Sequence, residues 1–321
     1  MSTNLLLALD YGGTKLSAAL TGIGERAWRA LKRVSSPPQH DAQYDQTTMR
    51  ALAHKLLGTD KPRAIGVSFG GPVDAARGRV ILSHHIPGWE ETLLRDQLQQ
   101  EFGVPVSVDN DANVAALGEY EFGVGCVGAI HESPLLYVTV STGVGGGLVI
   151  GGKIYNGADA MAGEIGHTIC DPRGALCICG RRGCVEAMAC GPAIARAVQE
   201  RLLAEPNAKT KLRELGSRED LTAAEVARAA NEGDELARAV MDAAARALGF
   251  GIGTAITLLN PARVVIGGGV SKSGERWWSA VRAAARANML PQMRVEIVPA
   301  ALGDDAPLWG AIALAEDLIR V

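Results

Sequence analysis

Two glycine-rich segments of the chain have the composition of turns that bind phosphate groups. They are Asp10-Tyr11-Gly12-Gly13-Thr14-Lys15 and Thr142-Gly143-Val144-Gly145-Gly146-Gly147. Because glycine carries no Cβ, backbone N–H groups in such turns can approach a polyphosphate closely. Thr14 adds a hydroxyl donor, and Asp10 adds a carboxylate that can hold Mg²⁺ directly or through water. Each segment alone also fits an ordinary hairpin turn, but together they predict a nucleotide site.

Neither segment matches the two commonest nucleotide-binding motifs. The P-loop pattern Gly-x-x-x-x-Gly-Lys-Ser/Thr does not occur in the sequence. The segment Gly143–Leu148 is not a Rossmann fingerprint, because we expect a strand and not a helix to follow it. The predicted nucleotide site is therefore of another kind.

A run of polar residues, Asp109-Asn110-Asp111, follows an apolar stretch at residues 104–108 that we expect to be a strand. Phosphoryl transfer to an alcohol needs a group that accepts the hydroxyl proton. A carboxylate at a strand end beside glycine-rich turns can supply that acceptor. Taken alone, the same run is more typical of a helix N-cap.

Four of the six cysteines crowd into residues 170–184, namely Cys170, Cys177, Cys179 and Cys184. In a reducing compartment such clustering favours metal ligation over disulfides. Tetrahedral Zn²⁺ binds thiolates and imidazole nitrogens, and three cysteines within eight positions can close a small knuckle around it. Free buried thiols are the alternative interpretation.

The overall composition narrows the class of protein. The 321 residues are 47% hydrophobic and 21% charged, which is ordinary for a soluble globular protein long enough for two domains. A net charge of -3 provides no broad basic surface, so we expect no nucleic-acid partner. We found no apolar run long enough to span a bilayer and no signal peptide in the sequence, and we therefore expect no membrane partner and a cytoplasmic protein.

Apolar runs and glycine turns predict an α/β fold. We expect strands at 4–9, 16–20, 64–69, 104–108, 135–140, 148–150 and 263–266, and helices at 91–102, 112–122, 192–203, 222–231, 234–259 and 306–319. The pattern of strand, glycine turn and strand occurs near Asp10 and again near Thr142, which indicates a duplicated architecture. Gly249, Gly251 and Gly253 in the helix at 234–259 indicate close backbone packing.

The motifs together resemble one family, the ROK proteins (repressors, open reading frames and sugar kinases) of the actin-like ATPase superfamily. The matching segments, in order, are Asp10-x-Gly-Gly-Thr-Lys15, Asn110-Asp111-Ala-Asn113, Ser141-Thr-Gly-Val-Gly-Gly-Gly147, Gly163-Glu-Ile-Gly-His167, Cys177-x-Cys-Gly-x-x-Gly-Cys184 with Glu186, and more weakly Gly267-Gly-Gly-Val270. The resemblance covers the chain from about Leu5 to near the C-terminus.

The resemblance implies an actin-like ATPase (ribonuclease H-like) α/β fold of two domains with ATP and sugar in the cleft between them. The smaller domain would comprise residues 1–118 and 305–321, with the first glycine turn and the catalytic aspartate. The larger would comprise residues 119–304, with a zinc knuckle and adenosine-binding turns. Many relatives are homodimers, sometimes dimers of dimers.

The resemblance also implies residue roles. Asp111 would be the catalytic base. The sugar ligands would be Gly71, Asn110, Asp111, Glu164, His167 and Glu186. The nucleotide, as ATP with Mg²⁺, would lie on Asp10, Gly12, Gly13, Thr14, Lys15, Thr142, Gly143, Gly268 and Gly269. Structural Zn²⁺ would be held by His167, Cys177, Cys179 and Cys184, with the second His167 nitrogen presented to the sugar.

Three functions compete at this stage. The first is ATP-dependent phosphorylation of a hexose, glucose or a similar sugar, at its 6-hydroxyl. The second is a kinase of N-acetylmannosamine or N-acetylglucosamine, which the combination of Ser141 with Gly163–Thr168 also resembles. The third is a sugar-responsive repressor, which we disfavour because the first turn starts at Asp10 and leaves no room for a helix-turn-helix domain. His84 and His85 stand where relatives more usually have an asparagine-containing pair. The identity of the sugar substrate is therefore left undecided by the sequence.

Overall fold

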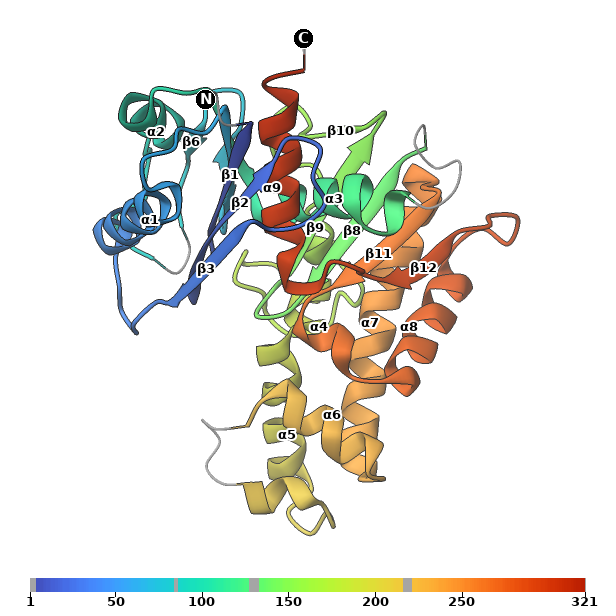
Figure 1. The fold of residues 1–321 in the computed structure, drawn as a ribbon. Coiled ribbons are helices and arrows are strands. Elements are labelled where there is room, and N and C mark those ends of the chain that lie inside the picture. The colour runs from blue at the N-terminus through green and yellow to red at the C-terminus, as the bar shows by residue number, and fades with distance from the viewer. Residues whose placement is uncertain (1–3, 84–85, 127–132, 216–220, 321) are drawn as a thin grey trace. The chain divides into compact units, whose positions relative to one another are not determined.

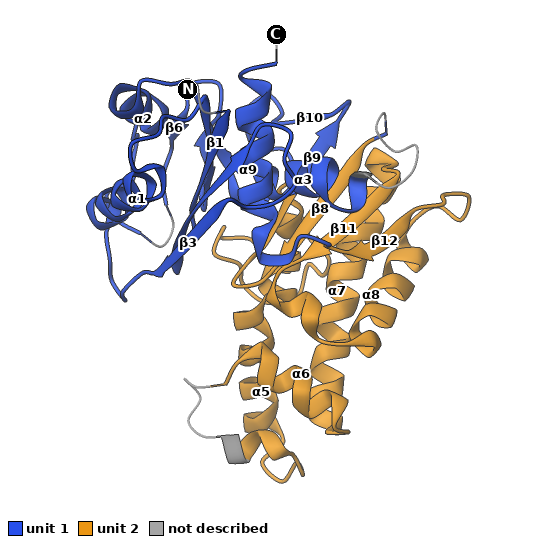
Figure 2. Cartoon of the chain, in the orientation of Figure 1, with its two compact units in different colours: residues 1–133, 147–162, 301–321 blue, residues 134–146, 163–300 orange. Residues whose placement is uncertain are grey.

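The computed structural model of the chain describes residues 4–83, 86–126, 133–215 and 221–320. His84 and His85 lie outside the described residues. The chain divides into two compact units (Figure 2). Unit 1 comprises residues 1–133, 147–162 and 301–321, and unit 2 comprises residues 134–146 and 163–300. The domain boundaries expected from the sequence stay a prediction.

The sheet of unit 1 has five strands in the order β3 (Ala30–Ser35), β2 (Lys15–Gly22), β1 (Leu5–Tyr11), β4 (Ala64–Phe69) and β7 (Val106–Asn110). Strand β1 pairs antiparallel with β2 and parallel with β4, so that Leu9 lies opposite Ala18 on one side and Val67 on the other. The predicted hairpin at the first glycine turn is confirmed. The parallel strands β1, β4 and β7 all end at the same edge, which brings Asp10 and Asn110 to that edge.

Strand β1 is apolar from Leu5 to Leu9 and buried along its whole length because helices cover both of its faces (Figure 1). Leu7 and Leu9 belong to the core that contains residues of α1 (Ala42–Leu57) and α2 (Leu94–Phe102). Leu6 and Ala8 belong to the core that contains residues of α3 (Asp111–Phe122) and α9 (Ala306–Asp317). Alternate side chains of a strand point to opposite faces, so a strand buried on both sides reads as a continuous apolar run.

The second sheet repeats the order of the first. Its strands are β10 (Lys153–Ile154), β9 (Val144–Ile150), β8 (Leu135–Val140), β11 (Arg263–Gly267) and β12 (Glu296–Pro299). As in unit 1, the strand that follows in the chain, β9, lies on one side of the first strand β8, and two parallel strands, β11 and β12, lie on the other. The duplication expected from the sequence is confirmed at the level of strand order.

Strand β9 begins earlier than predicted, at Val144 and not at residue 148. Gly146 and Gly147 therefore lie in extended backbone, and the second glycine turn is shorter than its sequence indicates. The reason is close packing. A Cβ on Gly146 would lie 2.5 Å from the Gly163 carbonyl oxygen, and one on Gly147 would lie 2.6 Å from that of Ala112. These glycines allow backbone segments to touch, while the turn itself spans Ser141–Gly143.

Among the described residues, four helices of unit 2 pack on the long helix α7 (Glu235–Leu259). They are α4 (Val185–Ala189), α5 (Gly191–Ala204), α6 (Ala223–Asn231) and α8 (Glu275–Asn288). A Cβ on Gly249 would lie 2.5 Å from the Val281 carbonyl oxygen, and one on Gly253 would lie 2.6 Å from that of Ala285. The close packing predicted from the α7 glycines is confirmed. By length and apolarity α7 could cross a membrane, yet 61% of its most apolar window is buried in the protein, as in a core helix.

Short elements complete the described chain. They are the strands β5 (Val73–Asp74) and β6 (Arg79–Val80) and the 3₁₀ segments Val124–Cys126, Ile165–His167, Lys211–Leu215, Gly269–Lys272 and Gly303–Asp305. The segment Ile165–His167 carries one of the residues assigned to the metal, and Gly269–Lys272 begins at the last glycine of the run Gly267–Gly269. These short elements matter because several candidate site residues lie on them.

Candidate active site

Within unit 1, the first glycine turn and Asp111 meet at Gly70. The Gly70 N–H donates to the Tyr11 carbonyl oxygen at 2.9 Å. A Cβ on Gly70 would lie 3.8 Å from the Gly13 nitrogen and 3.9 Å from Asp111 Oδ2. A side chain at this position would enter the space between the turn and the carboxylate. The structure thus brings the phosphate-type turn and the predicted base together on one edge of the sheet.

Asp10 is a buried carboxylate at the start of that turn, with 6% of its surface exposed. It accepts a hydrogen bond from Ser68 Oγ at 2.9 Å. Burial, with a further contribution from the charge of Asp111, raises the pKa of Asp10 to about 7, against the opposing charges of Lys15 and Arg33. Two carboxylates that disfavour each other's ionisation form a site where a divalent cation is stabilising.

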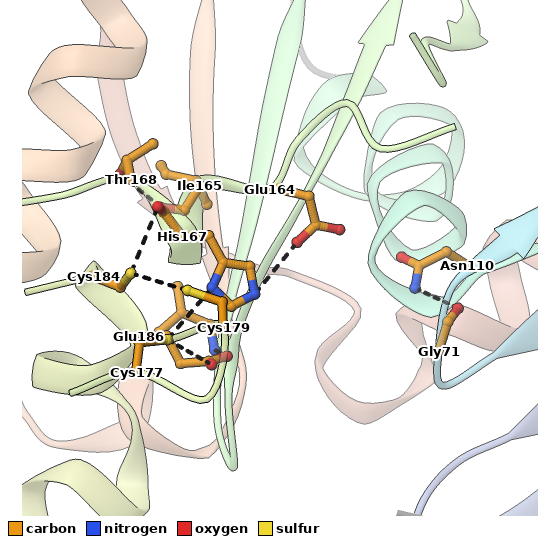
Figure 3. Close-up of polar contacts among 11 residues, drawn as sticks. Gly71, Asn110, Glu164, Ile165, His167, Thr168, Cys177, Cys179, Cys184 and Glu186 are labelled. Atoms are coloured by element: carbon orange, nitrogen blue, oxygen red, sulfur yellow. Dashed lines mark hydrogen bonds and ion pairs between the residues drawn. The ribbon is translucent and has the colours of Figure 1, made fainter. Parts of the chain in front are cut away.

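Asn110 and Asp111 lie at the start of helix α3. The run was expected to provide either a helix N-cap or a proton acceptor, and the two residues differ in this respect. Asn110 is the N-cap: its side-chain oxygen accepts the Ala112 N–H at 3.0 Å, and its amide nitrogen donates to the Gly71 carbonyl oxygen at 3.0 Å (Figure 3). Asp111 is the first helical residue, and its Oδ1 accepts the Ala112 N–H at 2.9 Å. The N-cap interpretation therefore holds for Asn110, while Asp111 faces Gly70.

Asp109, to which the sequence analysis gave no role, is the centre of a buried network. Its Oδ1 accepts hydrogen bonds from Asn113 Nδ2 at 3.0 Å and from the Asn110 N–H at 2.7 Å. Its Oδ2 accepts one from Asn156 Nδ2 at 3.2 Å. Burial raises the pKa of Asp109 even though these donors oppose the shift. The network ties the strand end that carries Asn110 and Asp111 to a distant segment of the chain.

Within unit 2, the four residues assigned to a metal lie together. The ligand atoms of His167, Cys177, Cys179 and Cys184 are all within 4.8 Å of one another. Cys177 Sγ is 3.6 Å from His167 Nδ1, and the sulfurs of Cys179 and Cys184 are 3.6 Å apart. Tetrahedral Zn²⁺ with Zn–S bonds of about 2.3 Å spaces its ligand atoms by roughly 3.8 Å. The donor set and its spacing therefore fit zinc.

The environment of Cys179 also suits a thiolate ligand. Hydrogen bonds from the backbone and the side chain of Arg181 lower the pKa of the Cys179 thiol to about 6. Metal ions bind the deprotonated form of cysteine, so a thiol that ionises readily favours ligation. Arg181 would also offset part of the negative charge of the bound thiolates.

His167 faces two groups, one with each ring nitrogen (Figure 3). Its Nδ1 points at the cysteine cluster, and its Nε2 lies 4.0 Å from Glu164 Oε2. Glu164 immediately precedes the short 3₁₀ segment that carries the histidine. The structure thus pairs the two predicted sugar ligands of this segment and leaves one histidine nitrogen for the metal.

Glu186 lies between the cluster and the second glycine turn. Its Oε2 accepts a hydrogen bond from the Val144 N–H at 3.0 Å, and its Oε1 is 3.9 Å from Cys177 Sγ. A Cβ on Gly143 would lie 2.7 Å from Glu186 Oε2, so the carboxylate packs closely against the turn at this position. Glu186 was expected to bind a sugar hydroxyl, and its contact with the turn has no signal in the sequence.

A pocket of about 890 Å³ lies in unit 2 beside that turn. Ser141, Thr142 and Gly269 line it, together with residues of helices α5 and α6. Gly268 supports its wall with φ +87°, and a Cβ there would lie 2.4 Å from the Val140 carbonyl oxygen. A volume of this size suits a small molecule of nucleotide dimensions. The sequence analysis found the glycines but not the helical residues, such as Arg196 and Asn231, because no motif marks them.

Comparisons with known proteins support one assignment. The model of the ROK family matches residues 6–318. The chain is 37% identical over 321 residues to the glucokinase of Halalkalibacterium halodurans (97% of this chain and 94% of that protein) and 33% identical over 310 residues to an N-acetylmannosamine kinase of Escherichia coli (97% and 98%). It is also similar to the crystal structure of a ROK family glucokinase from Streptomyces griseus in complex with glucose and AMPPNP, with a TM-score of 0.81, 33% identity and coverage of 98% of this chain and 99% of that one. The expected actin-like α/β fold is confirmed.

Proposed function

The chain belongs to the ROK family, and from that premise we propose that it is an ATP-dependent sugar kinase that phosphorylates a hexose hydroxyl. The similarity to the glucokinase of Halalkalibacterium halodurans and to the Streptomyces griseus glucokinase with glucose and AMPPNP supports this activity. The observation that carries the proposal in this molecule is the approach of Asp111 to the first glycine turn at Gly70. A proton acceptor beside a phosphate-binding turn is what phosphoryl transfer to an alcohol requires.

In the proposed reaction, Asp111 accepts the proton of the sugar hydroxyl as its oxygen attacks the γ-phosphorus. The new O–P bond forms while the bond between the γ-phosphorus and the β–γ bridging oxygen breaks, and ADP leaves with that oxygen. Backbone N–H groups of Gly12 and Gly13, the Thr14 hydroxyl and Lys15 would hold the terminal phosphates. Mg²⁺, held at Asp10, would supply charge neutralisation on the phosphates.

We assign the sugar hydroxyls to polar groups of both units. Asn110 and the Gly71 backbone are bonded to each other and present a preformed polar pair. Glu164 and His167 offer a carboxylate and an imidazole, and carboxylates form strong charge-assisted bonds with sugar hydroxyls. Glu186 is the remaining candidate. The adenosine part of ATP would occupy the pocket beside Ser141, Thr142 and Gly269, next to Gly143 and Gly268.

We assign a structural zinc ion to His167 and the three cysteines around it. The site offers four protein ligands, which leaves no position for a substrate and favours a structural role over a catalytic one. His167 would be held by the metal through Nδ1, so that the knuckle orients the side chain that faces Glu164. Homodimer formation stays a prediction from the family resemblance, and a cytoplasmic location stays a prediction from the sequence.

The second candidate function is a kinase of N-acetylmannosamine or N-acetylglucosamine. The 33% identity to an N-acetylmannosamine kinase over nearly the whole chain supports it. The chemistry at Asp111 would be the same, and only the pocket around the sugar C2 substituent would differ. The two candidates are therefore separated by substrate and not by mechanism.

A substrate screen tests the proposal directly. Purified protein with ATP and Mg²⁺ is offered glucose, mannose, fructose, N-acetylglucosamine and N-acetylmannosamine, and ADP release is measured against a control without sugar. We expect sugar-dependent ADP release that is highest with glucose. Highest release with an N-acetylated sugar would select the second candidate, and no sugar-dependent release with any of the five would overturn the kinase assignment.

A further inference from the structure

We infer that Glu186 is a positioning residue for the nucleotide site, and that helix α4 transmits the state of the cysteine cluster to the second glycine turn. This inference rests on the proposed function, because it concerns the turn assigned to ATP. All of the residues that carry it belong to unit 2. It assigns to Glu186 a role besides that of a sugar ligand.

The turn Ser141–Val144 is held at one end by helix α4 and at the other by Gly191, the first residue of helix α5. At one end, Glu186 Oε2 accepts the Val144 N–H at 3.0 Å. At the other end, the Gly191 N–H donates to the Ser141 carbonyl oxygen at 2.7 Å. Within the turn, Ser141 N–H donates to the Gly143 carbonyl oxygen at 2.9 Å. A turn fixed at its first and last residues has little freedom to change the direction of its N–H groups.

The contact between Glu186 and the turn is close as well as polar. A Cβ on Gly143 would lie 2.7 Å from Glu186 Oε2, which is shorter than any ordinary contact with a carboxylate. The carboxylate therefore packs directly against the middle of the turn. The hydrogen bond to Val144 is charge-assisted and therefore stronger than one between neutral groups.

The same helix begins at the cysteine cluster. Helix α4 starts at Val185, immediately after Cys184, and the Val185 N–H donates to the Thr168 carbonyl oxygen at 3.0 Å, one residue beyond His167. Glu186 Oε1 lies 3.9 Å from Cys177 Sγ. The cluster thus fixes the first turn of α4, and α4 fixes the glycine turn. A change at the cluster has a continuous path of contacts to the groups assigned to the nucleotide.

The competing interpretation is that Glu186 binds sugar and nothing else. The two interpretations differ in what happens when no sugar is present. A pure sugar ligand would leave nucleotide affinity unchanged on substitution, whereas a residue that holds the turn would weaken nucleotide binding even without sugar. Binding measured without turnover therefore separates them.

The experiment is calorimetric titration of the sugar-free protein with AMP-PNP and Mg²⁺. We compare wild type with Glu186→Ala, Glu186→Gln and, as a matched control, Glu235→Gln, which changes an exposed glutamate at the start of α7. We expect the dissociation constant of Glu186→Ala to rise roughly 10-fold or more, as loss of one charge-assisted bond implies. Glu186→Gln should show a smaller rise, because its amide oxygen can still accept from Val144, and the control should match wild type.

A second measurement tests whether the cysteine cluster affects nucleotide binding. Zinc is removed from the wild-type protein with a chelator, retention of secondary structure is checked by circular dichroism, and AMP-PNP affinity is measured again. We expect weaker nucleotide binding in the chelated protein and full zinc content in both Glu186 variants. Wild-type AMP-PNP affinity in Glu186→Ala would overturn the inference while leaving the proposed function intact. Failure of the wild-type protein itself to bind AMP-PNP would overturn the proposed function, and the inference with it.

Discussion

Asn156 Nδ2 donates a hydrogen bond to the buried Asp109 Oδ2 at 3.2 Å, across 47 positions of the chain. Asn113 Nδ2 binds both partners, with Asp109 Oδ1 at 3.0 Å and Asn156 Oδ1 at 3.1 Å. Asp109 stands two positions before Asp111, so this network fixes the strand end from which the proposed base extends. It also fixes the segment around Asn156, seven positions before Gly163 and the glutamate that follows it.

We predict that Asn156→Ala destabilises the protein by about 1–3 kcal/mol, because it leaves a buried carboxylate oxygen without its donor. The free energy of unfolding from urea titration measures the effect. Tyr155→Ala is the matched control, since the Tyr155 side chain is 51% exposed and its truncation should change stability little. Equal stability of Asn156→Ala and the control would show that the network contributes nothing.

We also expect the stability to depend on pH, because the pKa of Asp109 is raised in the folded state. Burial raises its folded pKa above the ordinary value of 3.8, so between those two values the folded state binds more protons than the unfolded state. Stability should therefore fall as pH rises from about 4 through the raised pKa, and Asp10 and Asp45, whose pKa values burial also raises, act in the same direction.

The variant Asp109→Asn isolates this contribution. It removes the ionisable group, so its free energy of unfolding should fall less steeply with pH than that of wild type. Urea titrations at several pH values between 4 and 8 give both curves. Parallel curves for variant and wild type would mean that Asp109 titrates alike in the folded and unfolded states.

The sequence indicated candidate site residues but not the contacts that hold them. Asp10, Asp111 and the cysteines were recognisable because the chemistry needs those residue types in those motifs. The partnership of Asp109 with Asn156 has no such signal, because it arises only when the fold brings residues far apart in the chain together. The same holds for Glu186, whose contact with Val144 depends on where α4 packs.

The strands and helices also differed in how well the sequence predicted them. The apolar run of β1 and the glycines of α7 were informative because burial on all sides leaves a strong pattern. Helix α1 was not predicted, since its polar composition hides the few side chains, such as Met49 and Leu52, that it buries. Strand β9 was predicted too short because glycine marks turns and close packing alike, and here three consecutive glycines lie in extended backbone.

Asp111→Asn tests the assignment of the base. General-base catalysis contributes about 100- to 10,000-fold in rate, so we expect kcat to fall by that range while the affinity for sugar, measured by titration without ATP, stays within a few-fold of wild type. The asparagine keeps the size of the side chain and the N-terminal position in α3. Turnover near the wild-type rate would remove Asp111 from the base role, and loss of sugar binding would show that its carboxylate holds the sugar or the fold.

Cys179→Ser tests the metal assignment. Loss of one of four ligands should lower zinc content and the melting temperature together, because binding energy at a structural zinc site stabilises the fold. Cys170→Ser is the control. Cys170 lies outside the four-residue cluster and donates to the Gly183 carbonyl oxygen at 3.3 Å, a bond that serine can keep. Full zinc content and an unchanged melting temperature in Cys179→Ser, measured by metal analysis and calorimetry, would count against the zinc site.

Two glycines of unit 1 should separate stability from nucleotide binding. A Cβ on Gly66 in strand β4 would lie 1.7 Å from the Ala311 carbonyl oxygen of helix α9, so Gly66→Ala must displace that helix. We expect a loss of at least the 1–3 kcal/mol that overpacking commonly costs. A Cβ on Gly13 would meet no atom of the described residues within 4 Å, and its φ is not positive.

Gly13→Ala should therefore leave the free energy of unfolding close to that of wild type. The same methyl group would stand where phosphate oxygens approach the backbone of the turn, so the dissociation constant for AMP-PNP with Mg²⁺ should rise by 10-fold or more. Urea titration and calorimetric binding on both variants check the pair. If Gly13→Ala bound AMP-PNP as tightly as wild type, the first glycine turn would not hold the nucleotide phosphates. The position of Asp111 beside that turn would then no longer support its role as the catalytic base.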